Sequence, residues 1–215
     1  MDAVIESLPL YWEGFRTTVA LALLSAVIAL AAGTLLGGFR VSPVPPLRWF
    51  GAGYVEIIRN TPLTILFAFL VFVAPQIGFR VPFFTSAVIA LSLYTAAFVC
   101  EAVRSGINSV GVGQAEASRA LGFTFRQTLG LIVLPQALRT VVPPLINIFI
   151  ALAKNTSVAG GFFVVELFGI GRRLTNEYPA DVIAVLIGVG IAYLIITIPS
   201  GLLAGYVERK VVFAR

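Results

Sequence analysis

Long stretches without a charged residue are the feature that most constrains how this chain can fold. A helix needs about 20 apolar residues, each adding about 1.5 Å, to cross about 30 Å of hydrocarbon. Four stretches are long enough, and a fifth is long enough if it tolerates Arg139. The sequence therefore predicts five membrane-spanning helices, at about residues 17–39, 60–79, 81–103, 129–153 and 182–207.

The composition agrees with an integral membrane protein. Hydrophobic residues make up 59% of the 215 residues and charged residues 12%, whereas soluble domains carry about 25% charged residues. No ten-residue segments alternate polar and apolar side chains as the strands of an outer-membrane barrel do. We expect an all-α fold in which residues 1–215 form one transmembrane domain without internal repeats.

The orientation follows from basic residues in short loops, because these gather on the cytoplasmic side. One set of loops holds Arg40, Arg48, Arg59, Arg104, Arg119, Arg126, Arg209, Lys210 and Arg215; the other holds Arg16, Arg80, Lys154, Arg172 and Arg173. The larger set predicts an N-terminus outside and a C-terminus inside. The first residues are acidic, unlike a secretory leader, so we expect the first helix to be retained. Topology accounts for the net charge of +5, and we expect lipid, not nucleic acid, as a partner.

Three connecting regions carry further expectations. "YVEIIR" in the first loop is either a short interfacial helix, with Trp49 and Tyr54 as headgroup anchors, or an ordered connector. Residues 155–165 are too short to cross, so residues 154–181 either dip into the membrane or pack outside it as a gate or lid. Pro143 and Pro144 predict a kink or a restart in the fourth span.

A short charged helix at residues 113–122 lies on the predicted cytoplasmic side. Ala117, Ala120 and Leu121 fall on one face, and Glu116 and Arg119 have the i, i+3 spacing of an ion pair. Glycines before and after this helix allow sharp turns. It is either a rod that docks on another protein or a helix lying on the headgroups.

The residues of this helix and the following turn resemble a known motif. The motif reads EAA, three residues, G, nine residues, I-x-LP, and here it is Glu116, Ala117, Ser118, Gly122, Ile132, Leu134 and Pro135. Only Ser118 departs from it, replacing alanine with another small residue. The chain thus resembles permease subunits of ATP-binding-cassette (ABC) importers. "EIIRNTPLT" and "LPQALRTVVPPLINIFIALAKNTS" are similar to the polar amino acid subgroup, the histidine, glutamine and glutamate permeases, and the likeness spans about residues 17–209.

The resemblance implies a multi-pass protein of the bacterial cytoplasmic membrane with the type I (MetI-like) permease fold. In that family the motif helix is a coupling helix that docks on a P-loop ATPase. The coupling residues it implies are Gln114, Glu116, Ala117, Ser118, Arg119, Leu121, Gly122, Leu134 and Pro135. It also implies a second permease, either another copy or a paralogue, and an amino-acid-binding protein outside the membrane. Glutamate or glutamine is the favoured substrate.

The chain lacks residues for chemistry of its own. It has no G-x-x-x-x-G-K-[ST] phosphate loop, no histidine, and one cysteine, Cys100, which we expect to be a buried core residue. We expect no catalytic or metal-binding residues, no enzyme activity and no bound cofactor, with ATP and Mg²⁺ on the partner. Two alternatives remain: a stand-alone secondary transporter or channel for a small polar solute, and a membrane scaffold.

Polar residues inside spans are the candidates for the substrate pathway. They are Asn147, Lys154, Asn155, Thr156 and Ser157. For each of them, helix packing or capping is the alternative role. Glu101 and Arg104, near the inner end of the third span, have the spacing of an i, i+3 ion pair.

Overall fold

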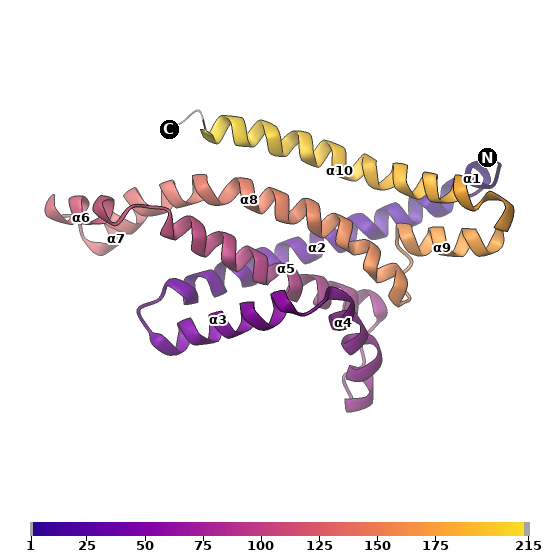
Figure 1. Cartoon of the computed structure of the whole chain (residues 1–215), viewed down its shortest axis with the longest axis horizontal. Coiled ribbons are helices and arrows are strands. Elements are labelled where there is room, and N and C mark those ends of the chain that lie inside the picture. Colours follow the sequence, from indigo (N-terminus) through magenta and orange to yellow (C-terminus); the bar gives the residue numbers. More distant parts are fainter. Residues whose placement is uncertain (1, 213–215) are drawn as a thin grey trace.

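The structure is a computed structural model that describes residues 2–212, and it is an elongated helical bundle (Figure 1). The elements are α1 (Asp2–Glu6), α2 (Leu8–Val41), α3 (Pro45–Asn60), α4 (Leu63–Ala68), the π-helix η1 (Phe69–Val73), the 3₁₀-helix η2 (Ala74–Ile77), α5 (Phe83–Asn108), α6 (Val112–Ala120), α7 (Phe125–Gln127), the π-helix η3 (Thr128–Val133), α8 (Leu134–Asn155), the 3₁₀-helix η4 (Thr156–Phe162), α9 (Leu167–Glu177), the 3₁₀-helix η5 (Pro179–Asp181) and α10 (Val182–Val212).

Four helical stretches are long and apolar enough to cross a membrane. They are Leu8–Val41, Phe83–Asn108, Phe125–Phe162 and Pro179–Lys210. A fifth span results if the bent pair Pro45–Asn60 and Leu63–Ile77 counts as one. The expected all-α membrane fold with about five spans is therefore confirmed.

Small residues bring α2 and α5 into close contact at the centre of the bundle. A methyl group added to Gly33 would lie 2.5 Å from Val99 Cβ, and one added to Gly37 would lie 2.8 Å from Val103 Cγ1. Neither site has room for a side chain. Small residues at helix contacts are typical of membrane proteins, where close van der Waals packing holds helices together.

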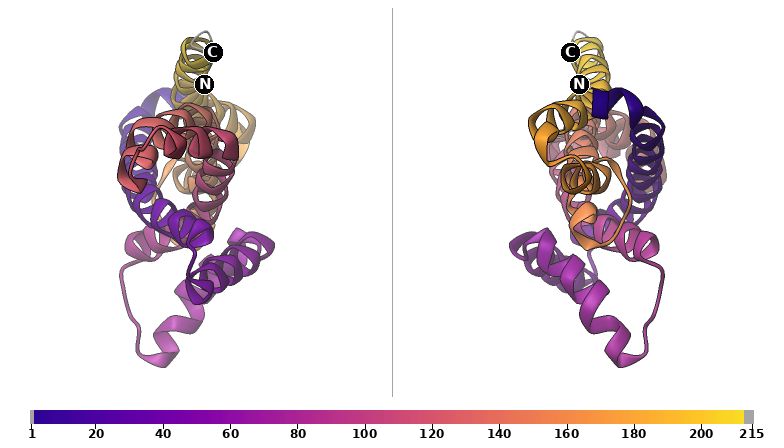
Figure 2. Two further views of the ribbon diagram at one scale, coloured as in Figure 1. Left: turned by 90° about the vertical axis from the view of Figure 1, so that its left-hand side faces the viewer. Right: turned by 90° about the vertical axis from the view of Figure 1, so that its right-hand side faces the viewer.

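The second span is broken, whereas the sequence predicts one straight helix at residues 60–79. α3 and the stretch Leu63–Ile77 meet at 98°, and Figure 2 shows α4 projecting from the bundle as an arm. Pro62 explains the break, because a residue that precedes proline is pushed out of the α conformation. Thr61 accordingly has φ −91° and ψ 127°.

The helix in the first loop is longer than "YVEIIR" and packs on the bundle. Tyr54 donates from its hydroxyl to the Leu93 carbonyl oxygen of α5 at 2.7 Å, and it packs beside Val55, Ala97 and Cys100. These contacts fit the ordered connector, the other alternative that the sequence leaves open for this loop. Trp49 is exposed on the same helix.

The expected restart near Pro143 does not occur. α8 continues through Pro143 and Pro144 from Leu134 to Asn155. It packs against both α5 and α10, and such packing allows membrane helices to tolerate proline. The irregular turns lie earlier, in η3.

The segment after α8 packs as an outer helix, one of the two arrangements that the sequence leaves open. Three apolar side chains of α9, those of Leu167, Ile170 and Leu174, are fully buried. They contact Tyr11 of α2 and Val185 of α10. Figure 1 places α9 at the end of the bundle opposite α6.

Candidate functional site

The predicted coupling helix, α6, lies beyond the ends of the long helices at one tip of the molecule (Figures 1 and 2). Gly122 follows it with a φ of +85°, a conformation that glycine adopts without strain. The Gly122 amide donates to the Arg119 carbonyl oxygen at 2.9 Å, and the Phe123 amide donates to that of Ser118 at 3.1 Å. These bonds close the C-terminus of α6 and turn the chain back toward the membrane.

Ser118 faces the chain itself. Its hydroxyl donates to the Ala115 carbonyl oxygen at 3.0 Å and lies 2.8 Å from Thr128 Oγ1 of η3. Both side chains are buried. The docking contact implied for Ser118 is therefore corrected: a small residue is needed here because α6 packs against η3, and its hydroxyl joins the two elements.

The turn between these elements is capped on its own. Thr124 Oγ1 accepts from the Gln127 amide at 3.4 Å, and Gln127 Oε1 accepts from the Thr124 amide at 2.9 Å. This capping box satisfies amides that would otherwise lack partners at the start of α7. The segment from α6 through η3 is therefore a locally braced unit at the base of α8.

The other implied coupling residues lie on the outside of this unit. Gln114, Glu116, Ala117, Arg119, Leu121, Gly122, Leu134 and Pro135 are all exposed. Glu116 and Arg119 do not form the ion pair that their spacing suggests; Arg119 Nε donates instead to the Ala115 carbonyl oxygen at 3.3 Å. Both charges are thereby available to a partner.

Two apolar side chains that the sequence analysis missed extend this surface. Val112 is 71% exposed and Phe125 is 77% exposed, next to Leu121 at 78%. Bulky apolar side chains this exposed at the tip of a protein are typical of a binding surface. The signal available in the sequence was Phe125, an apolar residue that comes shortly after the turn predicted at Gly122.

The five predicted pathway residues do not converge on one site. Asn147 Nδ2 lies 3.5 Å from Glu208 Oε1 of α10. Thr156 is fully buried and donates to the Ala153 carbonyl oxygen, and Ser157 donates to that of Lys154, both at 2.8 Å. These two hydroxyls cap α8, which is the alternative role weighed for them. Lys154 is exposed.

Asn155 alone among them lines a cavity between α5 and α8. The cavity has a volume of about 230 Å³ and is lined by Tyr94, Thr95, Phe98, Ile148, Ala151, Leu152 and Asn155. Three of these side chains carry polar groups and two are aromatic. Such a mixture suits a small polar solute.

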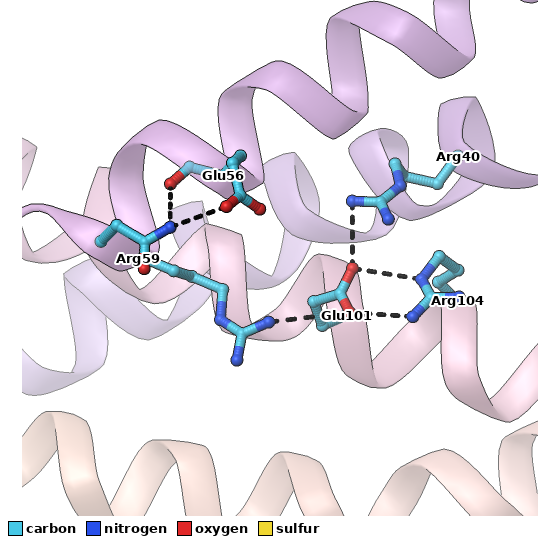
Figure 3. A network of polar contacts seen from close by, with 6 residues as sticks. Arg40, Glu56, Arg59, Glu101 and Arg104 are labelled. Atoms are coloured by element: carbon cyan, nitrogen blue, oxygen red, sulfur yellow. Dashed lines mark hydrogen bonds and ion pairs between the residues drawn. The ribbon is translucent and has the colours of Figure 1, made fainter.

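A cluster of charges joins α2, α3 and α5 nearby. Arg104 donates to both carboxylate oxygens of Glu101, at 3.1 and 2.9 Å, as the i, i+3 spacing predicts. Arg40 also lies 3.1 Å from this carboxylate, and Arg59 lies 3.7 Å from it. Figure 3 shows the three guanidinium groups converging on Glu101 from different elements. Only one of these three partners, Arg104, follows from the sequence.

A buried carboxylate that the sequence analysis also missed fixes the outer end of the bundle. Glu166 caps α9 and accepts from the amides of Phe168 at 3.0 Å and Gly169 at 2.7 Å. Thr18 of α2 donates to it at 3.4 Å, and Tyr193 of α10 at 2.5 Å. Burial raises the pKa of Glu166 above its ordinary range, although the four donors act against this rise.

Aromatic rings connect the arm to the segment that follows α8. The Phe67 ring lies 5.2 Å from that of Phe162, and the Phe72 ring of η1 lies 6.3 Å from that of Phe163. Phe163 has a φ of +64°, which is rare for a bulky side chain and marks a constrained backbone. These contacts pack η4 against the second part of the broken span.

Comparison with known proteins identifies the family. Residues 25–213 match the family described as "Binding-protein-dependent transport system inner membrane component". The chain is 38% identical over 214 residues to the probable glutamine ABC transporter permease protein GlnM of Bacillus subtilis (strain 168), covering 98% of this chain and 97% of that one. It is 37% identical over 221 residues to the glutamate transport system permease protein GluC of Corynebacterium glutamicum, covering 94% and 92%.

A solved structure agrees with this assignment. The crystal structure of an amino acid ABC transporter with histidines matches with a TM-score of 0.90 and 27% identity over 96% of each chain. The expected type I permease fold is thereby confirmed. The chain belongs to the family of inner membrane components of binding-protein-dependent transport systems, and it is a multi-pass permease subunit.

Proposed function

We propose that this chain is one permease half of an ABC importer for polar amino acids, with glutamine or glutamate as the favoured substrate. The relatives named for glutamine and glutamate transport support this substrate class. The observation that carries the mechanism is the exposed, braced coupling helix in a chain that has no phosphate loop of its own. Such a chain needs a partner that binds and hydrolyses ATP.

The geometry supports a mechanical route for the energy. Closure of two ATPase subunits on ATP and Mg²⁺ moves α6, which they hold through Glu116, Arg119 and the exposed apolar side chains. The bond between Ser118 and Thr128 passes this motion to η3 and so to α8. Rocking of α8 against the same helix of a second permease then switches the pathway from inward-open to outward-open, facing a soluble binding protein outside.

The substrate pathway belongs to the same proposal. Asn155 faces the cavity between α5 and α8 and is the strongest of the five predicted pathway residues. Lys154 is exposed at the outer end of α8 and would meet substrate arriving from the binding protein. Thr156 and Ser157 hold the end of this helix, and Asn147 contacts α10.

Affinity purification and reconstitution test the function. The tagged chain, purified gently from its own cells, should bring a P-loop ATPase with it. The complex with its binding protein, reconstituted in liposomes, should take up labelled glutamine or glutamate only when ATP is supplied. Uptake by the isolated chain without ATP would instead identify a stand-alone secondary transporter or channel. Absence of any transport would leave the membrane scaffold as the remaining alternative.

A further inference from the structure

α3 forms the first part of the bent second span, although Arg59, near its end, is among the basic residues expected on the cytoplasmic side. Arg16 and Arg40 border the apolar part of α2, so Arg40 marks the inner edge of the hydrocarbon. A methyl group added to Gly51 would lie 3.1 Å from Arg40 Cγ, which places Gly51 level with Arg40. α3 then runs back along α2 (Figure 1), so the Cα of Arg59, eight residues further on, lies about 12 Å deeper, while its guanidinium meets that of Arg40 at Glu101.

The face of α3 at this depth is polar and exposed. Glu56, Arg59 and Asn60 are all exposed, and Asn60 Nδ2 donates to Glu56 Oε1 at 3.0 Å. Charged side chains at such depth face the bundle interior or a water-filled cavity, because lipid cannot solvate them. The helix break at residues 61–62 also indicates a transport pathway here, because discontinuous helices at mid-membrane typically border such pathways.

Arg59 is the least constrained of the three arginines around Glu101. Arg104 and Arg40 already satisfy both oxygens of the carboxylate, at 2.9 to 3.1 Å. Arg59 reaches it only at 3.7 Å, and its side chain remains 44% exposed. The three guanidinium groups outnumber the two carboxylates near them, those of Glu101 and Glu56, so this cluster offers positive charge to an anion, and Arg59 is the member that can turn away (Figure 3).

The guanidinium of Arg59 lies against a ring that also lines the cavity between α5 and α8. Arg59 Cζ is 5.3 Å from the centroid of the Phe98 ring, and Phe98 lines the cavity of about 230 Å³ together with Thr95 and Asn155. Sites for drug-sized ligands measure about 300 to 1,000 Å³. A cavity below that range fits a small solute, and Phe98 connects its lining to the cation of Arg59.

We propose that Arg59 binds the α-carboxylate of the amino acid as it crosses the membrane. The long contact with Glu101 is exchanged for a bidentate one with the substrate, a geometry that guanidinium and carboxylate groups favour. Arg40 and Arg104 keep Glu101 satisfied during the exchange. This inference rests on the proposed function, because it takes an amino acid as the solute.

Equilibrium binding to the permease–ATPase complex in nanodiscs, without the binding protein, tests the contact. The probes are L-glutamine and L-glutamine amide, in which the α-carboxylate is replaced by a neutral carboxamide. The wild-type complex should bind glutamine about 10- to 100-fold more tightly than the amide, the ratio expected for a charge-assisted hydrogen bond. Arg59→Gln should abolish this ratio, and Arg59→Lys should keep part of it.

Arg48→Gln is the matched control, because Arg48 lies on the same helix at the membrane surface and should leave the ratio unchanged. A ratio near one in the wild type, or one that survives in Arg59→Gln, would overturn the inference while ATP-driven uptake still supports the proposed function. Equal weakening of both ligands by Arg59→Gln would show a structural role only and would also overturn it. If the intact importer transports no polar amino acid, both proposals fail.

Chemical modification gives a second test that does not depend on ligand affinity. Cys100, the one native cysteine, is fully buried, so Arg59→Cys introduces the accessible thiol. Uptake by this variant should be low, should recover after reaction with aminoethyl methanethiosulfonate, which restores a positive charge, and should stay low after the anionic sulfonatoethyl reagent. Recovery with both reagents, or with neither, would argue against a charge in a water-filled pathway.

Discussion

At Gly122 the backbone itself sets the requirement for glycine. Its φ of +85° costs other L-residues about 1–2 kcal/mol, yet no atom lies within 4 Å of where a Cβ would stand. The restriction is conformational and not steric. The motif spacing predicted a turn here, whereas the partner of Ser118 was not predictable, because the bond to Thr128 depends on how α6 folds back on η3.

Substitution at the two glycines of the coupling segment should therefore have opposite effects. Gly122→Ala should shift the equilibrium of the turn by about 5- to 30-fold against the native form and lower ATP-driven uptake. Gly113→Ala, inside α6 and with open space around it, should stabilise the helix, because alanine is the better helix former. ATP-driven uptake is measured for the reconstituted complex that carries each variant. A normal rate for Gly122→Ala would contradict the conformational requirement for glycine in this turn.

At the scale of elements, charge-free stretches predicted the spans because hydrophobic length is a property of sequence alone. Proline was a weaker guide. Pro62 breaks the second span, whereas Pro143 and Pro144 lie within a continuous α8. α8 is held between α5 and α10, and such packing lets a helix continue through proline, whereas the stretch that follows Pro62 meets α3 at 98°. Such contacts cannot be read from the local sequence.

Cysteine crosslinking can distinguish the outward and inward faces of α6. Leu121→Cys should crosslink to the ATPase subunit in membranes treated with a short reagent that joins a maleimide to a photoreactive group, because Leu121 is the most exposed large apolar side chain of this region. Ser118→Cys, three residues away and buried, should not react. Gel mobility and immunodetection of the crosslinked pair report the result. Efficient crosslinking from position 118 with none from position 121 would reverse the assigned docking face.

At the scale of the whole molecule, two carboxylates hold together elements that are distant in sequence. Glu101 joins α2, α3 and α5, and Glu166 joins α2, α9 and α10. Of the first cluster only the pair of Glu101 with Arg104 was predictable. The second was not, because Thr18 and Glu166 are 148 residues apart and no local pattern links them. The Glu166 cluster nevertheless requires glycine at position 160. A methyl group added there would lie 2.2 Å from Glu166 Oε1 and would displace the carboxylate.

The titration of Glu166 should appear in the stability of the purified protein. Burial raises its pKa in the folded state, so the folded protein binds a proton more tightly than the unfolded chain. Its contribution to stability is complete below the ordinary pKa of a glutamate and is lost as the pH rises through the folded value. Glu166→Gln has nearly the same volume and does not titrate.

The midpoint temperature of the wild type minus that of Glu166→Gln should therefore decrease as the pH is raised from about 5 to about 8. Each kcal/mol corresponds to about 2–4 °C for a chain of this size, so thermal unfolding in detergent at several pH values can resolve the trend. Glu177→Gln, on the exposed end of the same helix, should follow the wild type at every pH. Donors to a carboxylate lower its pKa, whereas desolvation raises it. If the temperature difference instead increased with pH, the four hydrogen bonds would outweigh burial, and the network would favour the charged carboxylate.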